Sequence, residues 1–263
     1  MKVTVVTPTW NARTHLRDCI ESARAQQCAD VEVEHIIVDA GSEDGTIELA
    51  RSYGLDVRVG KDRGIFDAIN KGSFNSTGEL LGFLGADDTL LPGGLKQIVD
   101  AYRAGGRPWV VGGIAWTGAG GESLGYLAAP PTWMNPSVHA SLGWNCIMHM
   151  ATYVSRPFFT ELGGFNIDYR VSGDYDFFSR ALKASPYTRV ASPIACFRRT
   201  GVNFSAVSLE RARVEYDTLA TREAPSSPLQ RRVSKLALQV WLNGRNPGWA
   251  FRKWALPSGA VLR

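Results

Sequence analysis

The sequence predicts an α/β fold built on a doubly wound, mostly parallel sheet. Three observations support this class: apolar, β-branched runs alternate with stretches of helical spacing, the loops between them are short, and polar residues gather where strands end. With 263 residues, of which 44% are hydrophobic and 21% charged, the chain is long and apolar enough for one large globular domain.

The first part of the chain carries this alternation most regularly. Its predicted elements are, in order, strand 3–7, helix 13–27, strand 35–38, helix 47–53, strand 56–59, helix 65–75 and strand 80–84. The first helix places four apolar residues on one face: Leu16, Cys19, Ile20 and Ala23. Strand-helix alternation with short connections favours parallel pairing.

The regularity ends near residue 105. Gly- and Pro-rich segments follow, with a loop-like run over 128–144 and a helix from about 174 to 183. We therefore expect a regular half over 1–105, a less regular half over 106–223 packed on the same sheet, and a tail over 224–263.

Composition excludes several classes of protein. The apolar run at the start is too short for a signal peptide, and none approaches the roughly 18 residues of a membrane span, so we expect a cytoplasmic protein. The four cysteines form no C-x-x-C pair, which predicts neither a disulfide framework nor a zinc site. After Glu223 the chain has seven bases and no acid. The part of the chain up to and including Glu223 therefore has 22 bases and 25 acids. The body therefore has no basic footprint for nucleic acid.

Two adjacent carboxylates, Asp87 and Asp88, follow the apolar strand 80–84. Open α/β sheets bind ligands at the carboxyl ends of their strands. Neighbouring carboxylates repel, and a hard divalent cation shared with a phosphorylated substrate relieves that repulsion. The pair predicts a metal-diphosphate site. The alternative is a solvated pair of acids opening the next helix, whose first turn suits Pro92.

Five motifs occur in a fixed order between residues 3 and 200. They are Val-Val-Thr-Pro-Thr-Trp-Asn at 5–11, Ile-Val-Asp-Ala-Gly-Ser-Glu-Asp-Gly-Thr at 37–46, Asp-Arg-Gly-Ile-Phe-Asp-Ala-Ile-Asn-Lys-Gly at 62–72, Gly-Ala-Asp-Asp at 85–88, and Gly-Gly-Phe at 163–165 followed by Gly-Asp-Tyr-Asp at 173–176. Their order resembles the inverting glycosyltransferases of family 2, which have the Rossmann-like GT-A fold. Segment 62–72 is most similar to the bacterial colanic-acid and polysaccharide-assembly type.

The resemblance implies that the half 1–105 binds a nucleoside-diphosphate sugar and that 106–223 binds the acceptor. The implied nucleotide-sugar residues are Thr7, Thr9, Asn11, Asp39, Asp62, Arg63, Asn70, Lys71 and Asp87. It also implies Mn²⁺ or Mg²⁺ held by Asp88 and Asp87, with His149 as a further ligand candidate.

Each of these roles has a plainer alternative. The polar residues after the first strand can cap the helix at 13–27, and Asp39 can close an Asx-turn instead of accepting the N–H of a base. Asn70 and Lys71 share a helix face with Asp67 and can form a solvated stripe. His149 lies in an apolar stretch, which is typical of a core histidine.

The resemblance also implies a catalytic base. Inverting transfer needs a carboxylate that takes the proton of the acceptor hydroxyl. Asp174 matches the family's position, and Asp176 is the second choice; the alternative is that Asp174 only stabilises the first turn of a helix after Ser172. The acceptor-side candidates are His149, Trp144 and Arg199. Trp144 can also be packing material, and Arg199 a solvated base.

The tail combines amphipathic spacing with positive charge. Leu229, Val233, Leu236 and Val240 follow 4-3-4 spacing, and Arg231, Arg232 and Lys235 lie on another face of the predicted helix. The aromatic residues Trp241, Trp249, Phe251 and Trp254 come after. Such a tail is typical of a helix lying on an anionic membrane surface, here the inner face of the plasma membrane. The alternative is a helix docked on the acidic body.

Together these features predict a metal-dependent inverting glycosyltransferase. The favoured donor is a UDP-sugar, and the acceptor a hydroxyl of a glycan or lipid-linked glycan in cell-surface polysaccharide assembly. A sugar-nucleotide pyrophosphorylase is one alternative, although residues 8–11 are not the Gly-rich basic loop it needs after its first strand. A sugar-nucleotide-binding or scaffold relative without turnover is the other.

Overall fold

The computed structural model describes residues 1–201, 203, 208–225 and 227–245. The elements of the first half are β1 (Lys2–Thr9), α1 (Arg13–Arg24), β2 (Glu32–Asp39), α2 (Thr46–Ser52), β3 (Asp56–Val59), α3 (Ile65–Phe74), β4 (Leu80–Phe83), β5 (Thr89–Leu90) and α4 (Gly94–Gly105). Those that follow are β6 (Trp109–Gly118), β7 (Ser123–Leu127), α5 (Pro136–Leu142), η1 (His149–Ala151), β8 (Thr152–Ser155), α6 (Arg156–Glu161), α7 (Gly173–Ala184), β9 (Thr188–Arg199), α9 (Leu209–Glu223) and α10 (Pro228–Arg245).

One mixed sheet runs through both halves, in the order β3-β2-β1-β4-β8-β6-β9-β5, with β7 paired to β6. The strands β3, β2, β1 and β4 are parallel. Strand β8 is antiparallel to both of its neighbours, β4 and β6, whereas β6 and β9 are again parallel. The predicted α/β class is confirmed, and the parallel order is confined to the first half and the β6-β9 pair.

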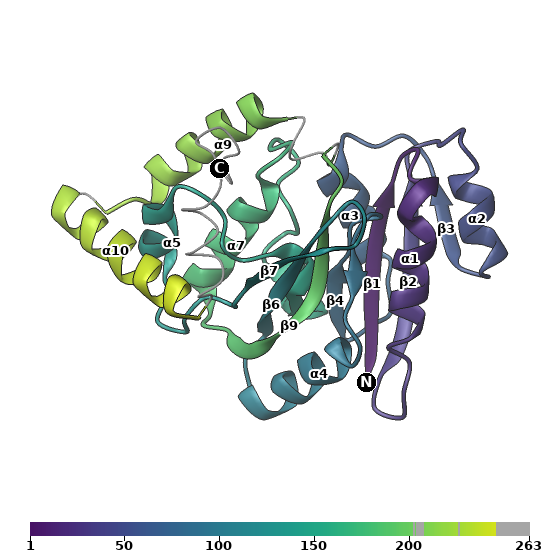
Figure 1. Ribbon diagram of the computed structural model, residues 1–263, viewed down its shortest axis with the longest axis horizontal. Helices are drawn as coiled ribbons and strands as arrows, with labels where there is room; N and C mark the ends of the chain where they lie inside the picture. The colour runs from purple at the N-terminus through teal and green to yellow at the C-terminus, as the bar shows by residue number, and fades with distance from the viewer. Residues whose placement is uncertain (202, 204–207, 226, 246–263) are drawn as a thin grey trace.

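Helices α1 and α3 cover opposite faces of the parallel strands. Neighbouring residues of a strand point to opposite faces. Thr7 of β1 contacts Cys19 of α1, while an added Cβ at Gly72 of α3 would meet Val6. Helix α1 buries Leu16, Cys19, Ile20 and Ala23, the four residues that its spacing predicts. This arrangement leaves the carboxyl ends of β1, β2 and β4 side by side at one edge (Figure 1).

The run 128–144, expected to be a loop, contains helix α5. The Asn135 side chain accepts a hydrogen bond from the backbone N of Val138, 3.0 Å away, and Pro136 occupies the first turn. An Asn-Pro pair is a helix start by capping and by the fixed φ of proline. The helix has only seven residues, which is too short for apolar periodicity to reveal.

After the sheet, the described part of the chain forms the helices α9 and α10. Helix α9 lies close to α5 and α7, and α10 packs against α5 at the end of the molecule remote from α2 and β3 (Figure 1). No helix among the described residues is long and apolar enough to cross a membrane. Trp249, Phe251 and Trp254 lie outside the described residues.

Candidate active site

The carboxyl ends of β1 and β2 hold Asp39 in a closed network. Its Oδ2 accepts hydrogen bonds from the hydroxyls of Thr9 and Ser42, and its Oδ1 from the backbone N of Gly41 and Ser42, at 2.6–2.9 Å. Burial alone raises the pKa of Asp39, but these donors outweigh it and hold the pKa below its ordinary value. The carboxylate is therefore ionised, and it shapes the loop after β2 as an Asx-turn acid.

Thr7 and Asn11 lie on either side of this network. The Thr7 side chain is fully buried, with its hydroxyl 2.9 Å from His35 Nε2, so it does not reach the sheet edge. Asn11 adopts φ 48° and accepts a hydrogen bond from the backbone N of Glu43 at 3.0 Å, tying the two loops together. Between them, Trp10 exposes 70% of its surface, a feature that the sequence reasoning missed.

The segment 61–71 is fixed mainly by its own side chains. Asp62 accepts from the backbone N of Gly64, and Lys71 donates to the carbonyl of Lys61 at 2.9 Å. Asn70 reaches across the molecule: its Nδ2 donates to the Phe165 carbonyl at 2.8 Å and its Oδ1 accepts from the Phe165 backbone N at 2.9 Å. The side chain of Arg63 is exposed. Asn70 and Lys71 thus hold loops, and Arg63 is open to a ligand.

The loop after β4 places Asp87 and Asp88 in different surroundings. Asp88 is 2% exposed, and its Oδ1 accepts from the backbone N of Arg198 at 3.1 Å. Burial, followed by the charge of Asp87, raises the pKa of Asp88 to about 7. Asp87 accepts from Asn203 Nδ2 at 2.6 Å. Nothing in the sequence signals Asn203, which stands 116 residues from its partner.

His149 links this acid pair to Asp174. Its Nδ1 lies 3.7 Å from Asp174 Oδ2. Burial alone lowers the pKa of His149, but the neighbouring Asp174, together with the charges of Asp88 and Asp87, outweighs it and raises the pKa above its ordinary value. Asp174 therefore contacts the imidazole directly, whereas Asp88 and Asp87 act on it through their charge.

Asp174 lies in the first turn of α7 and is oriented by a chain of buried side chains. Its Oδ2 accepts from Asn145 Nδ2 at 3.0 Å, and its Oδ1 accepts from the backbone N of Tyr175. Asn145 Oδ1 accepts from the backbone N of Ile147, and His139 Nε2 lies 3.0 Å from the same oxygen. Because Ile147 fixes Asn145 Oδ1 as an acceptor, His139 is the donor. The sequence reasoning missed Asn145 and His139.

Asp176 is buried in a different network. Its carboxylate pairs with Arg180 at 2.8 Å and Arg222 at 2.9 Å, and its side chain is 3% exposed. Both oxygens are thus engaged by guanidinium groups that join α7 to α9. This geometry favours Asp174 over Asp176 as the carboxylate available to a substrate.

The remaining acceptor-side candidates are dispersed. Trp144 is partly buried and packs against the hydrophobic core. Arg199 is the last residue of β9 and is exposed. The neighbouring Arg198 is held by Asp18 and His15 of α1, so its charge is partly neutralised by the body.

The resemblance implies a divalent cation at Asp87 and Asp88. No group of three or more His, Cys, Asp and Glu side chains able to hold a metal occurs within the described part of the chain. Asp88 nevertheless offers a buried carboxylate whose ionised form is disfavoured by Asp87, and a hard cation relieves such repulsion. The oxygen donors fit Mn²⁺ or Mg²⁺ if a bound diphosphate completes the ligands.

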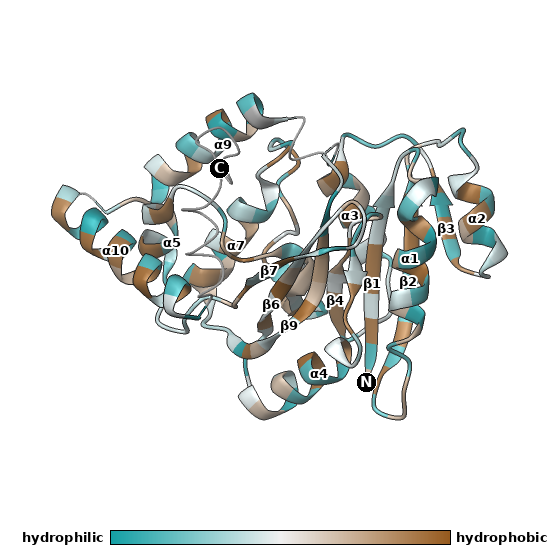
Figure 2. Cartoon of the chain, in the orientation of Figure 1, coloured by the Kyte–Doolittle hydropathy of each residue, from teal (hydrophilic) through white to brown (hydrophobic). Residues whose placement is uncertain are grey.

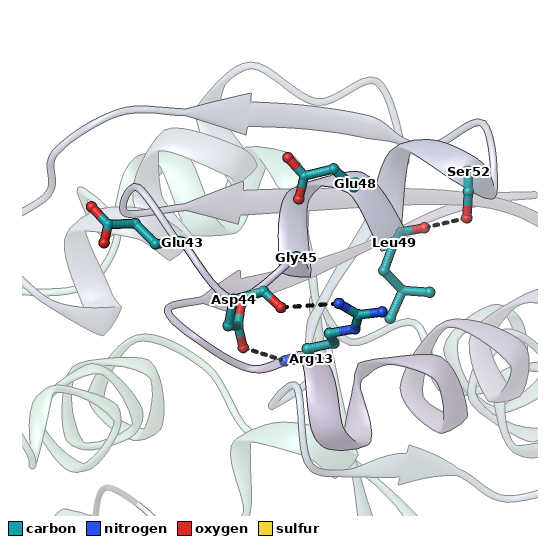
Figure 3. A pocket seen from close by; sticks show the side chains of 7 residues that line it. All are labelled: Arg13, Glu43, Asp44, Gly45, Glu48, Leu49 and Ser52. Atoms are coloured by element: carbon teal, nitrogen blue, oxygen red, sulfur yellow. Dashed lines mark hydrogen bonds between the residues drawn. The ribbon is translucent and has the colours of Figure 1, made fainter.

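A surface cavity of about 630 Å³ lies apart from these carboxylates, between α1 and α2 (Figure 3). Two hydrogen bonds join Arg13 and Asp44 in its wall: the backbone N of Arg13 donates to Asp44 Oδ2 at 3.1 Å, and Arg13 Nη1 donates to the Asp44 carbonyl at 3.3 Å. The cavity contains none of the candidate catalytic residues.

Comparison with known proteins leads to the same family as the sequence motifs. The sequence profile of the family described as "Glycosyl transferase family 2" matches residues 4–159 of the chain. The chain is 30% identical over 181 residues to a "PGL/p-HBAD biosynthesis glycosyltransferase" of Mycobacterium bovis and to its counterpart in Mycobacterium tuberculosis. The match spans 66% of this chain and 66% of the length of those relatives.

Solved structures share the fold. The TarS fragment of S. aureus in complex with UDP-GlcNAc has a TM-score of 0.67 at 17% identity, covering 91% of this chain and 72% of that one. Mannosyltransferase PcManGT from Pyrobaculum calidifontis, in complex with GDP-Man and Mn²⁺, has a TM-score of 0.60 at 19% identity, covering 99% and 76%. The GT-A architecture is thereby confirmed.

The family match covers more than half of the chain. It includes the carboxyl ends of β1 and β2, the acid pair and His149, and Asp174 follows it on α7. The chain belongs to glycosyl transferase family 2 and is a glycosyltransferase.

Proposed function

We propose that the protein transfers a sugar from a nucleoside diphosphate to a hydroxyl group with inversion at the anomeric carbon. The observation that carries the proposal is the pairing of Asp174 with His149 at 3.7 Å, near enough to Asp87 and Asp88 for their charges to act on the same imidazole. One side of this cluster is the strand edge where α/β folds bind nucleotides, and the other is the start of α7. Donor and acceptor can therefore meet between them.

The donor site lies at the ends of β1, β2 and β4. The exposed ring of Trp10 offers a surface on which a base can stack, and Asp39 shapes the loop beside it. Arg63 is the exposed base nearest the start of α3, where the helix dipole favours phosphate. A UDP-sugar is the favoured donor, and the neighbours bound to UDP-GlcNAc and GDP-Man support a nucleotide sugar in general.

Asp174 acts as the general base. Its carboxylate accepts the proton of the acceptor hydroxyl as that oxygen forms its bond to the anomeric carbon. The bond to the diphosphate breaks on the opposite side of the carbon, so configuration inverts. Asn145 holds the carboxylate in place, and His149 Nδ1 lies 3.7 Å from the same carboxylate oxygen.

Asp88 and Asp87 are the proposed ligands of Mn²⁺ or Mg²⁺, with His149 as the further candidate. When bound, the cation stabilises the negative charge that develops on the leaving diphosphate. The residues of the chain keep that region partly closed, since Asp88 is buried under the backbone of Arg198.

The proposed acceptor is a glycan or lipid-linked glycan used in cell-surface polysaccharide assembly, reached from the inner face of the plasma membrane. The relatives named for PGL/p-HBAD biosynthesis support a glycolipid-type acceptor. The acid-free segment after Glu223 supports the membrane location. The narrower colanic-acid type stays a prediction.

Nucleotide titration tests the donor site. UDP-GlcNAc, other UDP-sugars and GDP-Man are titrated into the protein with and without Mn²⁺, and the melting temperature and donor hydrolysis are measured, since a ligand of the native state raises its stability. Asp88→Asn is expected to lose at least roughly 10–100-fold of the Mn²⁺-dependent affinity, because loss of even a residue that only orients a metal ligand has an effect of that size. Asp168→Asn, at an exposed carboxylate, is the matched control.

The same titration separates the rival functions. Donor binding without hydrolysis or transfer under any metal condition would indicate a binding or scaffold relative. Release of inorganic diphosphate from a nucleoside triphosphate and a sugar phosphate would indicate a pyrophosphorylase. Unchanged Mn²⁺-dependent affinity in Asp88→Asn would reject the metal assignment.

A further inference from the structure

Charged side chains join helix α9 to helix α7. Helix α9 is mostly hydrophilic (Figure 2), yet two of its acids, Glu215 and Glu223, are only 9% and 7% exposed. Glu223 pairs with Lys183 of α7 at 2.7 Å, and Arg222 pairs with Asp176 of α7 at 2.9 Å. These ion pairs hold the last turn of α9 against α7, and Glu215 acts at the other end of the same contact.

Glu215 binds three consecutive backbone N–H groups. Its Oε1 accepts from the backbone N of Arg170 at 2.9 Å. Its Oε2 accepts from the backbone N of both Val171 and Ser172, also at 2.9 Å. Burial alone raises the pKa of Glu215, but these N–H groups, followed by Arg211, outweigh it and hold the pKa below its ordinary value. The side chain is therefore an ionised carboxylate that holds the backbone of 170–172 in one conformation.

The three N–H groups lie immediately before the proposed base. Helix α7 begins at Gly173, and Ser172 before it makes no side-chain capping bond. Gly173 packs tightly on α3, since a Cβ added to it would lie 2.6 Å from the Phe66 ring. The backbone that leads into Asp174 is thus fixed by Glu215 of α9 and by Phe66 of α3.

We propose that Glu215 is a positioning residue, which places Asp174 for proton transfer by fixing the backbone of 170–172. This role rests on the proposed function, in which Asp174 is the general base. Asn145 orients the Asp174 carboxylate at 3.0 Å, whereas Glu215 determines where its backbone lies. Glu215 stands beyond residue 159, where the match to the family profile ends. Because a reacting group misplaced by ~1 Å costs about 100-fold in rate, loss of these hydrogen bonds should slow the chemical step.

Glu215→Gln tests this role with a small change of shape. The amide has a single oxygen, so at least one of the three N–H groups loses its acceptor. We expect kcat to fall about 10–100-fold with an unchanged Kd for the donor. Asp217→Asn, at an exposed acid of the same helix, also removes one charge and should react like the native chain.

The reaction measured is hydrolysis of UDP-GlcNAc or GDP-Man, whichever the native chain binds more tightly. Water then takes the place of the acceptor hydroxyl and gives its proton to Asp174. The same substitution is also made in the Asp174→Asn variant. If Glu215 acts through the base, the rate of that variant should fall further by no more than about twofold. A residue that only stabilised the fold would lower the rate by the same factor in both backgrounds.

Equal factors in the two backgrounds, a native rate in Glu215→Gln, or weaker donor binding by Glu215→Gln would each overturn the positioning role and leave the proposed function intact. A native rate in Asp174→Asn, or no hydrolysis of either donor by the native chain, would instead count against the proposed function, and the role of Glu215 would fall with it. Glu215→Asp, which keeps the charge on a shorter side chain, is read in the same way if the Gln variant does not fold.

Discussion

At the scale of single residues, Asp174 and Asp176 show how two acids in one helix turn take different roles. Asp174 has one oxygen facing His149 and Asn145, whereas both oxygens of Asp176 are bound by arginines. A carboxylate whose two oxygens are both held by guanidinium groups has no free oxygen to accept from an acceptor hydroxyl.

The Asp174→Asn variant is therefore expected to bind donor normally and to lose transfer by about two to four orders of magnitude, the usual contribution of a general base. Asp176→Asn should instead lower the free energy of unfolding by about 1–3 kcal/mol, since it weakens charged hydrogen bonds to partly exposed arginines. Single-turnover transfer and urea unfolding measure the two effects. The opposite assignment would follow if Asp176→Asn alone abolished transfer.

Asn145 is expected to position the base without touching the substrate. Asn145→Ala removes the donor at Asp174 Oδ2 and should lower kcat about tenfold with an unchanged KM for the donor. Asn145→Asp keeps the shape but replaces the donor by an acceptor that repels the carboxylate, so its kcat should be lower still. Steady-state kinetics at fixed pH compares them, and a higher kcat in Asn145→Asp than in Asn145→Ala would contradict this role.

At the scale of elements, the β1-β2 pair contains a buried histidine that makes stability depend on pH. Burial lowers the pKa of His35 to about 4, against about 6.5 in the unfolded chain. Between these values the unfolded chain binds a proton that the folded chain does not. Stability is therefore fully present above the unfolded pKa and is lost as pH falls toward 4.

The His35→Gln variant should remove this dependence while preserving a partner for Thr7. The difference in unfolding free energy between native chain and variant should shrink by up to about 1.4 kcal/mol for each pH unit below ~6.5. Urea unfolding at several pH values between 7 and about 5 measures it. His139, whose pKa burial also lowers to about 4, remains in both proteins and cancels in the comparison. A constant difference across this range would show that His35 is not held neutral.

The elements that the sequence predicts well are those whose own residues carry the signal. β-branched runs and a helical apolar face identify β1, α1, β2, β3, α3 and β4 to within a few residues. Strand β6 is buried along its first six residues without alternation and includes Gly112 and Gly113, so neither period appears. The site follows the same rule. Asp87, Asp88 and Asp174 stand in recognisable motifs, whereas Asn145 and Asn203 bind two of these acids from 29 and 116 residues away in the sequence.

At the scale of the whole molecule, α10 belongs both to the fold and to its outer surface. Its Leu238 and Leu242 side chains are buried against the body, and each contributes about 1.5–3 kcal/mol. A chain ending at Ala224 should therefore unfold at a lower temperature than the full chain. Because a smaller fraction of its molecules is folded, a given amount of it should also bind less donor. Calorimetry of the two chains measures this. Equal melting temperatures would show that the helix is an independent appendage.

The acid pair depends on the far end of the sheet for its surroundings. The backbone N of Arg198 and the side chain of Asn203 bind Asp88 and Asp87, and β5 pairs with β9 directly behind them. During translation, a nascent chain that has emerged only to residue 159 contains every residue matched by the family profile but none of these partners. The two carboxylates then repel each other in an open loop. We therefore expect nucleotide-sugar binding to begin only after β9 has joined the sheet, late in synthesis.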